Sequence, residues 1–208
     1  HSATVSQTIT VVDTTAPTIT ALPTPSTIEC PAVPDFATPT ATDACDEHPT
    51  LLSADITTPG MCAGVYSVTR TWTATDHCGN LRSLSQTISV ADTAAPTLSA
   101  LPMPSTVECP ALPSFATPTA SDACDATVAL TSADVTTPGT CAQSHSVTRT
   151  WTATDCSGHS ATVSQTITVV DTTTPTITAL PTPSTSECPA VPDFATPTAT
   201  DACDEHPT

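Results

Sequence analysis

The chain is built from a 79-residue repeat, and this repeat constrains the fold more than any other feature. DTTAPTITALPTPSTIECPA at 13–32 returns as DTAAPTLSALPMPSTVECPA at 92–111 and as DTTTPTITALPTPSTSECPA at 171–190. Agreement is closest at twice this distance, because residues 1–50 match residues 159–208 at 48 of 50 positions. A repeat of this length is one structural module, so we expect a row of similar small domains.

The repeat also predicts where the modules begin and end. Residues 1–12 resemble the last strand of a preceding module, and residues 13–91 and 92–170 form two complete modules. Residues 171–208 then correspond to the first half of a third module. We therefore expect this chain to be a window of a longer array. The alternative is a chain end that a neighbouring chain completes.

Within each module, apolar and hydroxyl side chains alternate along the strands. From 66 to 74 the sequence is YSVTRTWTA, and from 83 to 90 it is SLSQTISV. Because successive side chains of a strand point to opposite sides of a sheet, each strand has one buried face and one Thr/Ser face. Frequent prolines exclude helices from the first half of a module.

This pattern predicts an all-β fold with six or seven short strands per module, arranged as a β-sandwich. The expected strands of the first module are 17–22, 26–30, 38–42, 50–57, 65–75 and 83–90. The expected core residues are Ile19, Leu22, Phe36, Leu51, Ile56, Val68, Trp72, Leu84, Ile88 and Val90.

Composition leaves disorder open and excludes several functions. Leu, Ile, Val and Phe make up about 17% of the chain at a net charge of -17, which is typical of disordered or mucin-like segments. The strict alternation and the ten cysteines favour a folded chain instead. Three Arg and no Lys argue against nucleic-acid binding, and no apolar run is long enough to span a membrane.

Each complete module holds four cysteines, which favours disulfides and an oxidising compartment. The cysteines of a module stand far apart in the sequence and include no C-x-x-C pair, which argues against zinc. Four cysteines allow three pairings, of which we favour first with third and second with fourth. The expected disulfides are Cys30–Cys62, Cys45–Cys78, Cys109–Cys141 and Cys124–Cys156.

Acidic residues gather in the loops around these cysteines and at the module boundaries. They offer oxygen ligands for a calcium ion, although no EF-hand pattern is present. The alternative is that they stabilise turns by accepting hydrogen bonds from the nearby backbone. The candidate calcium ligands are Asp13, Asp43, Asp46, Asp76, Asp92, Asp122, Asp125 and Asp155.

The hydroxyl faces are candidates for O-glycosylation, because the chain holds 48 Thr and many of them lie next to Pro. Sugars would hydrate a surface that carries few charges. The alternative is an ordinary Thr-rich β-surface. The candidate residues are Thr18, Thr20, Thr38, Thr40, Thr69, Thr71, Thr73, Thr148, Thr150, Thr152, Thr166 and Thr168.

The sequence favours a protein that is not an enzyme. His145, His159, Ser160 and Asp155 supply the atoms of a hydrolase triad, but no nucleophile motif frames them. The Arg of each TRTW string is expected to be structural, either stacked on an aromatic ring or paired with a carboxylate.

Read in order, these strings resemble the hyalin repeat (HYR and HYR-like) family. The most specific part is TRTWTATDHCGN at 69–80 followed by SQTISV at 85–90, and DCSGH at 155–159 departs from the usual D-x-C-G-N. The resemblance covers essentially the whole chain. It implies immunoglobulin-like β-sandwiches in tandem, extracellular or cell-surface location, and adhesive or spacer roles.

Three functions are consistent with these observations. The first is a structural repeat of an extracellular filament or adhesin stalk, whose partners are further copies of the same module and covalent O-glycans. The second is an adhesive module that binds through Ca²⁺ or carbohydrate. The third is a spacer in a large secreted enzyme.

Overall fold

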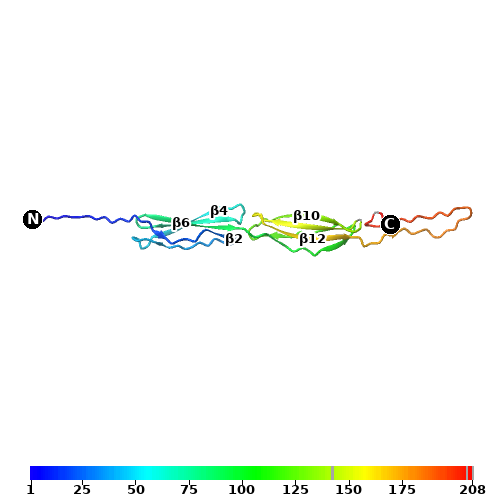
Figure 1. Ribbon diagram of the computed structural model, residues 1–208, viewed down its shortest axis with the longest axis horizontal. Coiled ribbons are helices and arrows are strands. Elements are labelled where there is room, and N and C mark those ends of the chain that lie inside the picture. The colour runs from blue at the N-terminus through cyan, green and yellow to red at the C-terminus, as the bar shows by residue number, and fades with distance from the viewer. Residues whose placement is uncertain (142, 205, 208) are drawn as a thin grey trace. The chain divides into compact units, whose positions relative to one another are not determined.

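The computed structural model (Figure 1) describes residues 1–208 except 142, 205 and 208. Two compact units are present. The first unit comprises His1–Ala95 together with Asp122–Thr127 and Asp155–His159, and the second comprises Pro96–Ser121, Val128–Thr154 and Ser160–Thr208. The described residues form strands and loops with no helix, and therefore none that could cross a membrane. The predicted all-β tandem fold is confirmed; the module boundaries remain a prediction.

The first unit contains the six strands expected for one module. They are β1 (Thr18–Ile19), β2 (Ser26–Glu29), β3 (Ala41–Thr42), β4 (Thr50–Pro59), β5 (Tyr66–Thr75) and β6 (Leu81–Ala91). Four of them form a sheet in the order β2-β6-β5-β4, in which β2 runs parallel to β6 and the other pairs are antiparallel. β1 and β3 form a separate antiparallel pair.

The second unit repeats this topology and continues into the next repeat. Its strands are β7 (Thr97–Leu98), β8 (Ser105–Glu108), β9 (Ala120–Ser121), β10 (Ala129–Pro138), β11 (His145–Thr154), β12 (Ser160–Val170), β13 (Thr176–Ile177) and β14 (Ala199–Thr200). The main sheet has the order β10-β11-β12-β8 (Figure 1), and β13 pairs with β14.

The predicted alternation is confirmed on the two central strands. Trp72 and Ala74 are buried on β5, and Ile88 and Val90 on β6, while the hydroxyl residues between them are more exposed. Ile19 of β1 joins this core. Few large apolar side chains are therefore buried, which makes the core small for a domain of this length.

The prediction that Ile56 belongs to the core is wrong, because its side chain is 68% exposed. β4 is the edge strand of the sheet and pairs only with β5. Leu51, on the same strand, is half-buried. Ile56 lies opposite Thr69 and therefore on the hydroxyl face of the sheet, whereas Leu51 lies opposite Ala74 on the buried face.

Residues 1–12 are exposed, with Val5 fully so and Val11 at 91%, and their assignment to a preceding module stays a prediction. The same twelve residues recur at 159–170, where they supply β12 between β11 and β8.

The Arg of the first TRTW string joins two strands, as expected for a structural role. Arg70 donates from Nε and Nη2 to the two carboxylate oxygens of Asp55, each at 2.7 Å. Its guanidinium lies 4.5 Å from the ring centre of Phe36, which in turn meets Trp72 edge-on at 6.2 Å. The bidentate pair lowers the pKa of the Asp55 carboxyl, first through its hydrogen bonds and then through charge attraction.

The exposed and buried isoleucines offer a matched test of this core. Replacing Ile88, which is 4% exposed, by Ala should lower the free energy of unfolding by about 2–5 kcal/mol. Ile56→Ala should change it by less than about 0.5 kcal/mol, because that side chain is already in water. Thermal or chemical denaturation of the two variants checks this, and equal losses would contradict the placement of Ile56 on the exposed face of β4.

Candidate functional site

The four cysteines of a repeat are divided between the two ends of its sheet. Cys30 follows β2 beside the end of β6, where its N–H donates to Ala91 O at 2.9 Å, and Cys62 lies in the turn between β4 and β5. We call this the trailing end. Cys45 lies in the loop before β4 and Cys78 in the turn between β5 and β6, at the opposite, leading end.

The disulfides join the trailing end of one repeat to the leading loops of the next repeat. They are Cys30–Cys124, Cys62–Cys156 and Cys109–Cys203, each spanning 94 positions, with Cα atoms 5.6–5.7 Å apart. First cysteines bond to second cysteines and third cysteines to fourth ones. The junction formed by such a pair of bonds is the candidate functional site.

The predicted pairings Cys30–Cys62, Cys45–Cys78, Cys109–Cys141 and Cys124–Cys156 are therefore wrong. The prediction rested on the correct expectation that the second and fourth cysteines lie in facing loops at one end. The structure bonds these loops to the preceding repeat instead of to each other. Among the described residues Cys45, Cys78, Cys141 and Cys188 form no disulfide.

The loops Asp122–Thr127 and Asp155–His159 belong to the first unit although they come from the second repeat. Asp125 holds them together, because its Oδ2 accepts the Cys156 N–H at 2.8 Å. Gly64 allows the close approach: a Cβ on this residue would lie 2.4 Å from the carbonyl oxygen of Cys124. The close backbone contact and the disulfides therefore both occur at the junction between the first repeat and the leading loops of the second.

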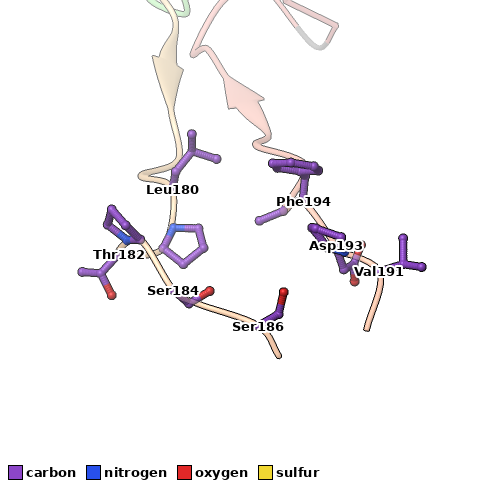
Figure 2. Close-up of a pocket in the computed structure, with 11 residues that line it drawn as sticks. Leu180, Thr182, Ser184, Ser186, Val191, Asp193 and Phe194 are labelled. Atoms are coloured by element: carbon purple, nitrogen blue, oxygen red, sulfur yellow. The ribbon is translucent and has the colours of Figure 1, made fainter. Parts of the chain in front are cut away.

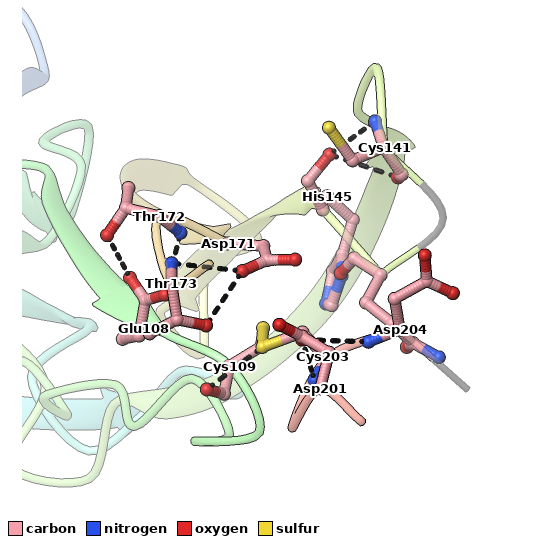
Figure 3. The surroundings of a disulfide bond; sticks show 12 residues. Glu108, Cys109, Cys141, His145, Asp171, Thr172, Thr173, Asp201, Cys203 and Asp204 are labelled. Atoms are coloured by element: carbon pink, nitrogen blue, oxygen red, sulfur yellow. Dashed lines mark hydrogen bonds between the residues drawn. A yellow bond between two sulfur atoms is a disulfide. The ribbon is translucent and has the colours of Figure 1, made fainter. Parts of the chain in front are cut away.

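Figure 3 shows the corresponding arrangement in the second unit. The bond between Cys109 and Cys203 is buried, at 8% and 4% exposure, and the sulfur of Cys203 lies 3.2 Å from Cys109 O. Cys141 stands nearby in its turn with an exposed sulfur, where its N–H donates to Ser144 Oγ at 3.0 Å.

A glutamate next to each first cysteine holds the start of the following repeat. Glu29 accepts the Thr93 N–H at 2.9 Å and the Thr93 hydroxyl at 2.7 Å, and Glu108 binds Thr172 in the same way at 2.7 and 2.9 Å. The backbone bond from Thr93 is the main reason that the pKa of the Glu29 carboxyl is lowered. Sequence reasoning missed this contact. Their recurrence 64 positions before a Thr was the available signal.

The eight predicted calcium ligands are used as backbone acceptors. Each of the eight accepts a hydrogen bond from a backbone N–H in its own loop or turn. Within the described residues, at most two of them join any one group of neighbouring ligand atoms, as Asp13 and Asp43 do with Cys45, or Asp92 and Asp155 with His159. Ca²⁺ prefers six to eight oxygens, so this geometry favours the turn-stabilising alternative, and calcium binding stays a prediction.

The hydroxyl residues of β5 and β6 bond to one another across the strands. The pairs are Thr69–Thr87 at 2.9 Å, Thr71–Ser85 at 2.9 Å and Thr73–Ser83 at 2.8 Å, and Thr148–Thr166 repeats the first at 2.9 Å. Among the glycosylation candidates, the residues on these central strands are half-buried. Thr18, Thr20, Thr38 and Thr40, outside the main sheet, are exposed.

The pocket drawn in Figure 2 is lined by residues of segment 180–195 in the second unit. Leu180 and Phe194 lie on the two segments that face each other across it, and the pocket has a volume of about 350 Å³. Phe194 is equivalent to Phe36, which packs against Trp72 in the first unit, whereas residues 171–208 contain no Trp.

The family comparison identifies the repeat. A family model described as "HYR-like domain with 4 cysteines" matches residues 18–90 and again residues 98–169. No curated protein matches the chain.

The solved structures that match the chain include cadherin ectodomains. Drosophila N-cadherin EC1-4 shares 14% identity at a TM-score of 0.30, over 74% of this chain and 50% of that one. The human desmocollin-1 ectodomain shares 12% at 0.30, over 76% and 42%. Mouse clustered PcdhgC3 EC1-3 shares 11% at 0.32, over 75% and 68%. The chain spans about half the length of the first two.

The disulfide pattern can be determined from one digest. Trypsin cuts after Arg70, Arg82 and Arg149. After oxidative folding at low protein concentration and alkylation of free thiols, peptides 1–70, 83–149 and 150–208 should remain joined, and peptide 71–82 should be released with Cys78 alkylated. Mass spectrometry without reduction checks this. Pairing within repeats would instead attach peptide 71–82 to peptide 1–70.

Proposed function

Because this chain belongs to the family of HYR-like domains with four cysteines, we propose that it is a tension-bearing structural repeat of an extracellular filament or stalk. The disulfides and the family fit a secreted or extracellular protein. The observation that carries the proposal is the direction of the bonds. Each disulfide joins a repeat to the next repeat. Disulfides that only stabilise a single module would form within that module.

The bonds create a short covalent route along the chain. From Cys30 the route crosses to Cys124, runs back along the backbone to Cys109, and crosses again to Cys203. In the second repeat, tension is therefore carried by segment 109–124, which is a small part of the 79-residue repeat. The rest of the module lies outside this route and cannot be pulled open while the bonds are intact.

Stretching a single molecule between its termini tests this route. With the disulfides intact, the covalent route from residue 1 to residue 208 holds about 50 residues and should reach at most roughly 170 Å. After reduction the same molecule should reach roughly 700 Å, because all 208 residues become available. Optical-tweezer or atomic-force extension measures both values. An oxidised chain that extends several hundred ångströms would contradict a tension-bearing role.

We further propose that the exposed hydroxyl residues carry O-linked sugars. Support comes from the position of Thr18, Thr20, Thr38 and Thr40, which lie exposed outside the main sheet. Thr38 and Thr40 also flank Pro39 in an extended loop. Sugars there would cover an edge of the sandwich that has only two-residue strands, where unpaired backbone favours association with other chains.

Intact mass of the protein from its native source tests the glycosylation. The measured mass should exceed the mass of the protein's complete polypeptide by multiples of a sugar residue, and β-elimination should remove the excess. Site mapping should find sugar on Thr38 and Thr40 more often than on Thr69 or Thr148, whose hydroxyls are engaged with a partner across the strands. An unmodified mass would contradict the proposal.

A further inference from the structure

A histidine replaces an asparagine in one of two equivalent turns of the chain. His159, directly before β12, lies 79 positions after Asn80, which directly precedes β6. Each of them stands four positions after an aspartate, Asp155 or Asp76. We propose that His159, Asp155 and Asp92 bind a zinc ion. All three residues belong to the first unit, and the inference goes beyond the proposed tension-bearing role without depending on it.

The two turns have the same backbone hydrogen bonds, so the difference lies in the side chains. Asp76 Oδ1 accepts the Asn80 N–H at 2.8 Å, and Asp155 Oδ1 accepts the His159 N–H at 2.8 Å. The glycine that precedes the last residue of each turn has a positive φ, +90° in the first turn and +94° in the second.

The asparagine satisfies its aspartate, and the histidine does not. Asn80 Nδ2 donates to Asp76 Oδ2 at 2.8 Å. In the second turn Asp155 Oδ2 and His159 Nδ1 lie 3.3 Å apart, and both atoms are buried without a hydrogen-bond partner among the described residues. The Asp155 side chain is fully buried. A buried carboxylate oxygen without a partner is costly, so a ligand for this pair of atoms is expected.

The separation of these two atoms fits two ligands of one zinc ion. Zinc binds carboxylate oxygen and imidazole nitrogen at about 2.0–2.1 Å in a tetrahedron, which places neighbouring ligand atoms about 3.3 Å apart. Asp92 is 8% exposed and supplies a third ligand atom within 4.8 Å of the other two, so a small movement of its side chain completes the set. The fourth position is left to water.

The ligand set favours zinc over calcium. Ca²⁺ takes six to eight oxygen ligands, whereas an imidazole nitrogen together with two carboxylates suits zinc. The neutral His159 ring binds the metal through Nδ1 and keeps its proton on Nε2. Glu29 also lies close to Asp92, but its two oxygens accept hydrogen bonds from Thr93, so it is not counted as a ligand.

The zinc ion connects two strand ends where successive repeats meet. Asp92 directly follows β6 of the first sheet, and Asp155 and His159 lie in the turn between β11 and β12. The same turn carries Cys156, which is bonded to Cys62. The metal therefore adds a second cross-link beside this disulfide, and it is one that a reductant does not open.

Calorimetric titration with Zn²⁺ tests the site in the full chain. The chain is first oxidised so that its disulfides form, and its exposed thiols are alkylated so that they do not bind the metal. His159→Asn gives the second turn the residue of the first, so it should fold normally and bind zinc at least about tenfold more weakly. Asp92→Asn should weaken binding in the same direction. The matched control is His77→Asn, which removes an exposed histidine of the first turn and should leave the affinity unchanged.

Thermal unfolding gives a second measurement. Zinc should raise the Tm of the unaltered chain and of His77→Asn, and it should leave the Tm of His159→Asn unchanged, because only a folded site binds the metal. An intact Cys62–Cys156 bond, found by mass spectrometry, confirms that each variant is folded.

The alternative is an ion pair between a protonated His159 and Asp155, which needs no metal. Equal zinc affinity of the unaltered chain and His159→Asn would support this ion pair and overturn the inference. An equal loss of affinity in His77→Asn would show binding by exposed histidines and would also overturn it. Displacement of the zinc by an equal concentration of Ca²⁺ would contradict the choice of metal.

Discussion

The bonds between successive repeats supply the stability that the interior of each repeat lacks. The large apolar side chains buried in the described part of the first sandwich are Ile19, Trp72, Ile88 and Val90, which is few for a domain of about 80 residues. Closing a loop of 94 residues restricts the unfolded chain by about 4–5 kcal/mol in the chain-entropy model, and the loops overlap, so their contributions do not add. The stability of one repeat therefore depends on its disulfides to the next repeat.

Most of the architecture could be predicted from the sequence, because strand alternation and the 79-residue repeat are local or simple signals. The long strands occur where the pattern places them, and the second and fourth cysteines do lie in neighbouring loops. The pairing could not be predicted: Cys30 and Cys62 share the trailing end, so a bond between them looks as reasonable as bonds to the next repeat. Choosing requires knowing that the Asp122–Thr127 loop reaches Cys30. Ile56 was misplaced because it stands five residues after Leu51 and so lies on the opposite face of β4, with Thr69 as its cross-strand neighbour.

The polar residues have the same role throughout: they satisfy backbone groups in a molecule with few apolar contacts. Aspartates hold the turns that carry the cysteines, Glu29 and Glu108 hold the first residues of the following repeat, and paired hydroxyls line the outside of the sheet. Many of the carboxylates that give the chain its net charge of -17 accept backbone hydrogen bonds.

The overlapping spans of the disulfides also determine what a protease can do to the molecule. The spans 30–124, 62–156 and 109–203 leave no peptide bond between Cys30 and Cys203 unbridged. A single cut anywhere in that interval, for example in the exposed turn at Gly60–Met61, leaves both fragments attached. Severing the molecule requires several cuts or a reductant, so such a chain would survive nicking in an environment rich in secreted proteases.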